Sequence, residues 1–185
     1  MPLQNHSIIV IIAGWQYIHL QICNLAVHKS NIDPSCTDFK KLPSSSPFRK
    51  YCETLKYTVK ANRLYKKVVK WFNQGRKSTL QFRFTGKESK KVSKNFMHLI
   101  NSISSDSDSP AVTVKIASLS YAALQLRNAV SRFVQVSITQ DTITELELSC
   151  KYFFNCCSLL LGNVTPTVWT VGYAIPRHCK LISMG

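Results

Sequence analysis

Apolar residues recur at steps of three and four along most of the second half of this 185-residue chain. One stripe covers residues 112–133 and another covers 143–160. This spacing puts the apolar side chains of each stripe on one face of an α-helix, whereas a strand would alternate them. The stripes are Val112, Ile116, Leu119, Ala123, Leu126, Val130, Phe133, and Ile143, Leu146, Cys150, Phe153, Cys157, Leu160. We therefore expect two long helices, 110–136 and 139–161, packed as an antiparallel pair.

Helix-end signals predict further helices before this pair. Residues 49–74 carry apolar side chains at three- and four-residue steps, and Gly75 follows where a helix commonly ends. Thr85 and Glu88 have the spacing of a capping box, in which each side chain accepts a hydrogen bond from the other residue's backbone N–H. This pattern predicts a second helix that runs to about Ile103.

One short segment has the period of a strand. Residues 78–85 alternate apolar and polar side chains, and the apolar run at 8–13 is the partner that the chain offers. The expected fold is mainly α, a small helical bundle of four to five helices with at most one short strand pair. The alternative is an α+β fold with a small sheet. A last helix is expected to begin at Thr165–Pro166 and to be broken at Pro176.

Composition divides the chain into four segments. Residues 1–28 contain no Lys, Arg, Asp or Glu and form a charge-free apolar segment, and residues 29–47 form a Pro- and Ser-rich linker. Residues 48–176 are the helical domain, and 177–185 are a tail without a capping pattern, which predicts a fragment of a longer protein. The first segment fits a buried strand or helix, a signal peptide or a membrane anchor.

The positive charge is concentrated in one part of the chain. The protein has 24 Lys and Arg against 9 Asp and Glu, a formal charge of +15. Residues 40–94 contain 17 of these cations and only Glu53 and Glu88 as acids, so this segment carries the whole excess. Such a local field favours an anionic partner: nucleic acid, an anionic membrane surface or an acidic protein. A merely solvated basic surface is the alternative.

The strongest candidate site is a row of cations within the expected 49–74 helix. The row advances by steps of four and three residues, so it would line one helix face for about 21 Å. No zinc-finger, RNP-like or GXXG motif accompanies it, so binding would rest on phosphate contacts without base reading. The predicted nucleic-acid-binding residues are Lys56, Lys60, Arg63, Lys67 and Lys70 of the row, then Arg76, Lys77, Lys87, Lys90, Lys91 and Lys94.

No motif for catalysis or metal binding stands out. The chain has no G-x-S-x-G or H-E-x-x-H sequence, and its cysteines lack the paired spacing of structural zinc sites. We therefore expect no catalytic residue, no metal and no cofactor. The seven cysteines are odd in number and irregularly spaced, which predicts reduced thiols in an intracellular protein, nuclear or cytoplasmic.

The leading hypothesis is a non-enzymatic basic helical module that binds nucleic acid, DNA or RNA, mainly through phosphate contacts. The alternative is a membrane-associated or protein-interaction domain, anchored by the apolar N-terminal segment and packing helices 110–136 and 139–161 against a partner. A third hypothesis is an enzyme fragment whose other catalytic residues lie beyond Gly185. No small-molecule substrate is inferred.

Overall fold

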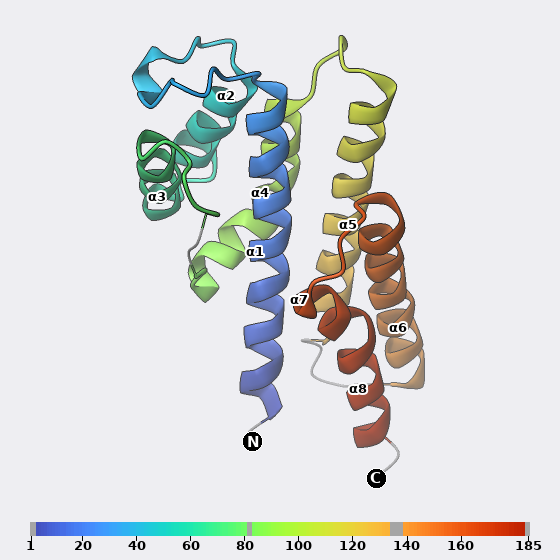
Figure 1. Ribbon diagram of the computed structural model, residues 1–185. Coiled ribbons are helices and arrows are strands. Elements are labelled where there is room, and N and C mark those ends of the chain that lie inside the picture. The colour runs from blue at the N-terminus through green and yellow to red at the C-terminus, as the bar shows by residue number, and fades with distance from the viewer. Residues whose placement is uncertain (1–2, 81–82, 134–138, 184–185) are drawn as a thin grey trace. The chain divides into compact units, whose positions relative to one another are not determined.

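The computed structural model describes residues 3–80, 83–133 and 139–183 (Figure 1). These residues are mainly helical, which confirms the predicted fold class, although they form more helices than the four to five expected. The α-helices are α1 (Leu3–Lys29), α2 (Pro47–Glu53), α3 (Asn62–Asn73), α4 (Gly86–Ile103), α5 (Pro110–Phe133), α6 (Gln140–Asn155), α7 (Pro166–Trp169) and α8 (Ile175–Ser183). Between them lie a 3-10 turn, η1 (Phe39–Lys41), and three π-helical turns, η2 (Thr54–Thr58), η3 (Cys156–Leu160) and η4 (Thr170–Ala174).

The described residues contain no strand, so the small sheet of the α+β alternative is not formed there. The apolar run 8–13 lies inside α1. Residues 78–80 and 83–85 are irregular, and residues 81–82 of the expected strand lie outside the described residues. The run is helical because the charge-free apolar stretch continues far beyond it. An apolar stretch of this length favours a helix over a strand.

The chain forms two compact units. Unit 1 comprises Met1–Ile18 and Ser109–Gly185, and unit 2 comprises His19–Asp108, so each unit receives part of α1. This grouping differs from the four segments expected from composition. Much of the charge-free segment is buried, with Trp15, Ile18 and Ile22 shielded from solvent, because its apolar side chains belong to the cores.

In unit 1, α5 and α6 run antiparallel, as predicted (Figure 1). The interior positions of both apolar stripes are buried, among them Leu119, Leu126, Leu146 and Phe153. Tyr17 of α1 adds its ring to this core at 6.5 Å from the ring centre of Phe153. The periodicity therefore identified the main packing surface of this unit.

The expected helix break at Pro176 is wrong. The chain continues from η4 into α8, and Pro176 is the second residue of that helix. Because α7, η4 and α8 follow one another without a gap, Pro176 lies inside one helical run, directly after a π-turn, where the regular bonding to the residue four positions earlier is already interrupted. Residues 177–183 of the expected tail therefore belong to α8.

Unit 2 is built around a small aromatic core. Phe39 of η1, Phe48 of α2 and Phe72 of α3 have ring centres 5.2 to 6.2 Å apart. The predicted capping box at the start of α4 is present, with Thr85 and Glu88 each accepting from the other's backbone N–H. These contacts hold the short helices of the basic segment against one another.

Helix α1 is long and apolar enough to cross a membrane, judged by length and composition. The stretch Val10–Lys29 has a mean hydropathy of 1.3, and half of it is buried inside the protein. A core helix of a soluble protein meets the same criterion, so this property does not separate the two roles.

All seven cysteines lie in the described residues and are free thiols, as predicted. Six of them are buried. Burial raises the pKa of Cys23, Cys150 and Cys157 to about 12, which leaves these thiols protonated and poorly nucleophilic at neutral pH.

Candidate nucleic-acid interface

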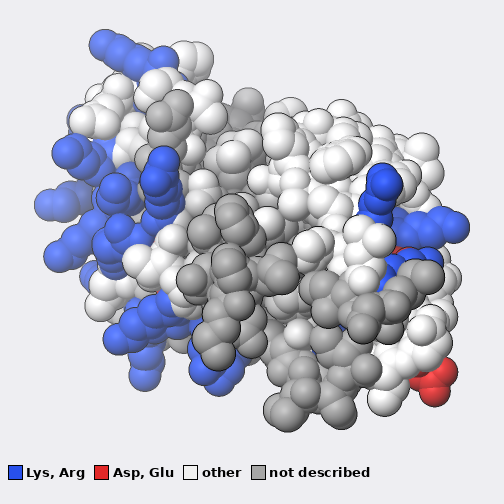
Figure 2. All heavy atoms as spheres, turned by 90° about the horizontal axis from the view of Figure 1, so that it is seen from below, with Lys and Arg blue, Asp and Glu red and all other residues white. Residues whose placement is uncertain are grey.

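Unit 2 carries most of the positive charge of the protein. It contains 18 Lys and Arg and 6 Asp and Glu, which leaves a net charge of +12. Lys and Arg side chains crowd its surface in Figure 2, with no Asp or Glu visible among them in that view. Within the described part of this unit, only Lys29, Arg49 and Arg63 form ion pairs. Most of its cations therefore have no carboxylate to neutralise them.

The expected row of cations does not lie on one straight helix, which corrects the prediction. The segment 49–74 divides into α2, η2 and α3, and the chain turns at Lys60. Lys60 has φ +55°, a left-handed conformation, and the N–H of Ala61 donates to the carbonyl oxygen of Leu55 at 2.9 Å. The turn buries Leu55 and Leu64 on both sides of the break, which a continuous apolar stripe did not reveal.

Arg63 is tied to an acid that lies far away in sequence. Its Nε donates to Oε1 of Glu88 at 2.7 Å, and its Nη2 bonds the second carboxylate oxygen of Glu88 and the carbonyl oxygen of Arg83. Burial opposes the ionisation of Glu88, but hydrogen bonds from Arg63 and from Thr85 outweigh it and keep the pKa of Glu88 below its usual value. Arg63 therefore joins α3 to α4 and is less available to a ligand.

Helix α3 presents the most regular basic face. Leu64, Val68 and Phe72 are buried on one side of the helix. Lys67 and Lys70 of the predicted row are exposed on the other side, together with Lys66, which the sequence analysis did not include. The signal for Lys66 was present, because residues three and four apart share a helix face.

Lys56 lies in η2 and Lys91 in α4, close to the turn at Lys60. The Nζ of Lys56 lies 4.8 Å from the ring centre of Tyr57 and 5.3 Å from that of Tyr65. The Nζ of Lys91, from α4, donates to the carbonyl oxygen of Lys60. The structure thus brings Lys56, Lys60 and Lys91 to one corner of unit 2.

The remaining predicted residues differ in how free they are. Lys77 and, on α4, Lys87, Lys90 and Lys94 are exposed. Arg76 instead packs over the ring of Phe72 at 4.7 Å and donates to the carbonyl oxygens of the 33–36 segment at 3.4 Å. Arg76 therefore supports the fold of unit 2 more than it extends the basic face.

Comparison with protein-family models, curated proteins and solved structures finds no match for this chain. Its function has to be argued from charge and geometry. Among the described residues, no group of three or more His, Cys, Asp or Glu side chains has the arrangement to hold a metal ion.

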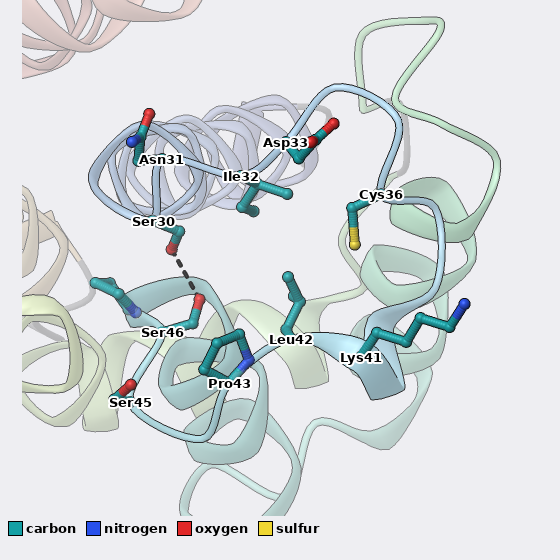
Figure 3. A pocket seen from close by; sticks show the side chains of 11 residues that line it. Ser30, Asn31, Ile32, Asp33, Cys36, Lys41, Leu42, Pro43, Ser45 and Ser46 are labelled. Carbon is teal, nitrogen blue, oxygen red and sulfur yellow. Dashed lines mark hydrogen bonds between the residues drawn. The ribbon is translucent and has the colours of Figure 1, made fainter.

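Unit 2 also contains a pocket of about 420 Å³, lined by residues from 30 to 47 (Figure 3). Ser30 and Ser46 lie together at one side of it, where the Ser46 hydroxyl donates to that of Ser30 at 3.1 Å, and the Ser30 hydroxyl also accepts from the N–H of Phe48. Lys41 is its one cationic lining residue in the described part of the chain. These two serine hydroxyls bond to each other, and the other polar or charged lining residues include Asn31, Asp33, Lys41 and Ser45.

His19, which is buried, is unsuited to catalysis. His19 of α1 is fully buried and forms a hydrogen bond with the hydroxyl of Tyr51. Burial lowers the pKa of His19 to about 3, despite the opposing field of Glu88. A neutral imidazole without solvent access cannot exchange protons with a substrate, so its role is structural.

Proposed function

We propose that the protein binds the phosphate backbone of nucleic acid through the exposed cations of unit 2. The observation that carries the proposal is the net charge of +12 on a 90-residue unit, most of whose cations have no carboxylate partner. Phosphates would relieve the repulsion among these cations and release counterions into solution.

Two neighbouring helices would form the contact surface. Lys66, Lys67 and Lys70 project from α3, and the Arg63–Glu88 pair joins α3 to α4, which carries a second group of exposed lysines. Because phosphate charges recur along either strand, such a surface needs no defined sequence. The proposal therefore predicts salt-sensitive binding without base preference.

The test compares two triple variants of equal charge change. Lys67→Glu/Lys70→Glu/Lys90→Glu reverses charges in unit 2, and Lys115→Glu/Lys151→Glu/Arg177→Glu reverses exposed charges in unit 1. Affinity for a labelled oligonucleotide is measured by fluorescence anisotropy at about 50 mM salt. The unit 2 variant should bind about 100-fold more weakly, since three phosphate contacts are lost.

The unit 1 variant should keep most of the affinity if the local basic surface matters. Equal losses in both variants would mean that total charge alone drives binding, and an undiminished unit 2 variant would refute the proposal. Circular dichroism of all proteins checks that the helical content is unchanged.

A second candidate function is protein interaction through unit 1, since large apolar side chains are exposed there. Trp169 and Tyr173 are each 54% exposed, and their ring centres lie 6.4 Å apart. A groove of about 690 Å³ beside Tyr173 is lined by α6, η4 and α8. The exposed apolar residues of unit 1 are Val114, Tyr121, Leu148, Tyr152, Leu159, Leu160, Val164, Trp169, Tyr173 and Leu181. Trp169 and Tyr173 lie side by side, and adjacent exposed aromatic side chains are typical of protein-binding sites.

A photo-cross-linking amino acid tests this second function. Placed at Trp169 of the full chain in cells, it should give one discrete adduct, whereas the same group at exposed Thr113 should not. Equal labelling from both positions would argue against a partner at the aromatic surface.

A further inference from the structure

Tyr57 is an unusual residue for the surface on which it lies. Its side chain is 65% exposed, and among the described residues of unit 2 Met97, at 45%, is the other exposed large apolar side chain. Other aromatic rings of this unit, such as Phe48 and Phe72, are fully buried. An exposed ring among lysines contributes little to the core, so its position calls for another explanation.

The backbone around Tyr57 is also irregular. Tyr57 lies in the π-helical turn η2, in which the N–H of Val59 donates to the carbonyl oxygen of Thr54 at 2.9 Å. Three residues later, Lys60 adopts a left-handed conformation that costs a side-chain-bearing residue free energy. Single π-turns and left-handed residues other than glycine are enriched at binding sites.

A lysine contacts the Tyr57 ring and orients it. Lys56 donates from Nζ to the Tyr57 hydroxyl at 3.1 Å and lies 4.8 Å from the ring centre. The same Nζ lies 5.3 Å from the ring centre of Tyr65, which anchors it to α3. The Tyr57 ring is thus held by a cation and still open to solvent over most of its surface.

Two more cations belong to this corner. Lys60 is exposed, and Lys91 of α4 donates to its carbonyl oxygen. Proteins that bind single-stranded nucleic acid combine an aromatic ring, on which a base stacks, with cations that contact the adjoining phosphates. Lys56, Tyr57 and Lys60 lie within one turn of chain, and Lys91 reaches them from α4. One of the three N–H groups of Lys91 bonds the Lys60 carbonyl oxygen, which leaves two that can donate to a phosphate.

We propose that Tyr57 stacks against an unpaired base and that Lys56, Lys60 and Lys91 contact the flanking phosphates, so that unit 2 prefers single-stranded nucleic acid. This inference rests on the proposed function. A duplex keeps its bases stacked on one another and can offer only phosphates to this surface.

The experiment compares a labelled 15-nucleotide oligo(U) with a labelled duplex of equal length. Tyr57→Ala in the full chain should weaken oligo(U) binding by about 5- to 150-fold, the range for losing one stacked base. Duplex binding should change less than about twofold, since phosphate contacts remain. Tyr57→Phe keeps the ring and should bind oligo(U) like the original protein. Met97→Ala, at the other exposed apolar residue of unit 2, should bind both probes normally.

The outcomes distinguish a failure of the stacking inference from a failure of the proposed nucleic-acid binding. If Tyr57→Ala binds oligo(U) as well as the original protein does, or loses both probes equally, the stacking role is refuted while phosphate binding stands. If the original protein binds neither probe at about 50 mM salt, both proposals fail. Matching thermal unfolding curves for Tyr57→Ala and Met97→Ala would show that loss of binding is not loss of fold.

Discussion

His19 links the stability of unit 2 to pH. Its imidazole is buried against Tyr51 and the ring of Phe84, whose centre is 5.5 Å away. The pKa of His19 is lowered from 6.5 to about 3, so below pH 6.5 the unfolded chain binds a proton that the folded chain does not. The stabilising contribution is therefore complete above pH 6.5 and is lost as the pH falls toward 3.

We expect the free energy of unfolding to fall by about 2 kcal/mol between pH 7 and pH 5 because of this histidine. His19→Gln should remove most of this pH dependence, although it lowers stability at pH 7. Urea unfolding at the two pH values measures both effects. Few carboxylates titrate in this interval, so an unchanged pH dependence in His19→Gln would contradict the assignment.

Substitutions at Lys60 can test separately the effect of its left-handed backbone on stability and the effect of its charge on binding. Glycine adopts φ +55° without strain, so Lys60→Gly should raise the free energy of unfolding by about 1 kcal/mol. The same change should weaken nucleic-acid binding, because it removes an exposed ammonium group. Chemical unfolding and fluorescence anisotropy on the same protein test both effects.

Lys60→Ala is the matched control, because it removes the charge but keeps a Cβ in the left-handed region. It should lose binding as Lys60→Gly does, without the gain in stability. If Lys60→Gly is more stable than the original protein but binds nucleic acid equally tightly, Lys60 does not contact phosphate.

Among the helical elements, η4 approaches α6 at a glycine. A Cβ placed on Gly172 would lie 2.6 Å from the Cβ of Phe154, whose own position is set by the α6 backbone. Gly172→Ala should therefore force the two segments apart and cost about 1–3 kcal/mol. Thermal unfolding followed by circular dichroism measures the loss.

Gly14 of α1 provides the comparison. A Cβ there would meet only the methyl groups of Leu126, at 3.1 Å, and a leucine side chain can shift. Gly14→Ala should then cost little, since alanine also favours the helix by up to about 1 kcal/mol. Equal destabilisation by the two substitutions would show that backbone proximity at Gly172 is not the cause.

For the molecule as a whole, the dependence of affinity on salt reports how many cations contact phosphate. Four residues of the expected row, Lys56, Lys60, Lys67 and Lys70, form no ion pair among the described residues, whereas Arg63 forms one. If these four contact duplex DNA, the logarithm of affinity should fall with the logarithm of salt concentration with a slope near −3.6, or about −0.9 per contact.

Lys67→Gln/Lys70→Gln should flatten this slope by about 1.8, because two contacts are removed. The slope of Lys115→Gln/Lys151→Gln, which changes unit 1, should equal that of the original protein. A slope that does not change in the first variant would place the phosphate contacts elsewhere on unit 2.

Features that depend on near neighbours in sequence could be predicted well. The α5 and α6 stripes, the Thr85–Glu88 capping box and the helix end at Gly75, which has φ +77°, all lie where periodicity and residue type indicated. Each is governed by side chains or backbone groups no more than four residues apart, so the local chain contains the information. The concentration of charge in residues 40–94 likewise follows from the order of residues.

Features that depend on how the segments pack in three dimensions could not be predicted from the sequence. Tyr57 lay outside the apolar stripe, and the order of residues did not show that its ring would be exposed with Lys56 beside it. The turn at Lys60 was missed because its apolar neighbours kept a helical spacing across the break.

The charge excess and the helical faces therefore follow from residue order, since both are sums or repeats over adjacent residues. Folding decides which cations are neutralised. Arg63 meets Glu88 from 25 positions away, and Lys91 reaches the carbonyl oxygen of Lys60 from 31 positions away. Ion pairs and hydrogen bonds act over a few ångströms in space, and the packing of α4 against α2 and η2 brings these groups within that distance.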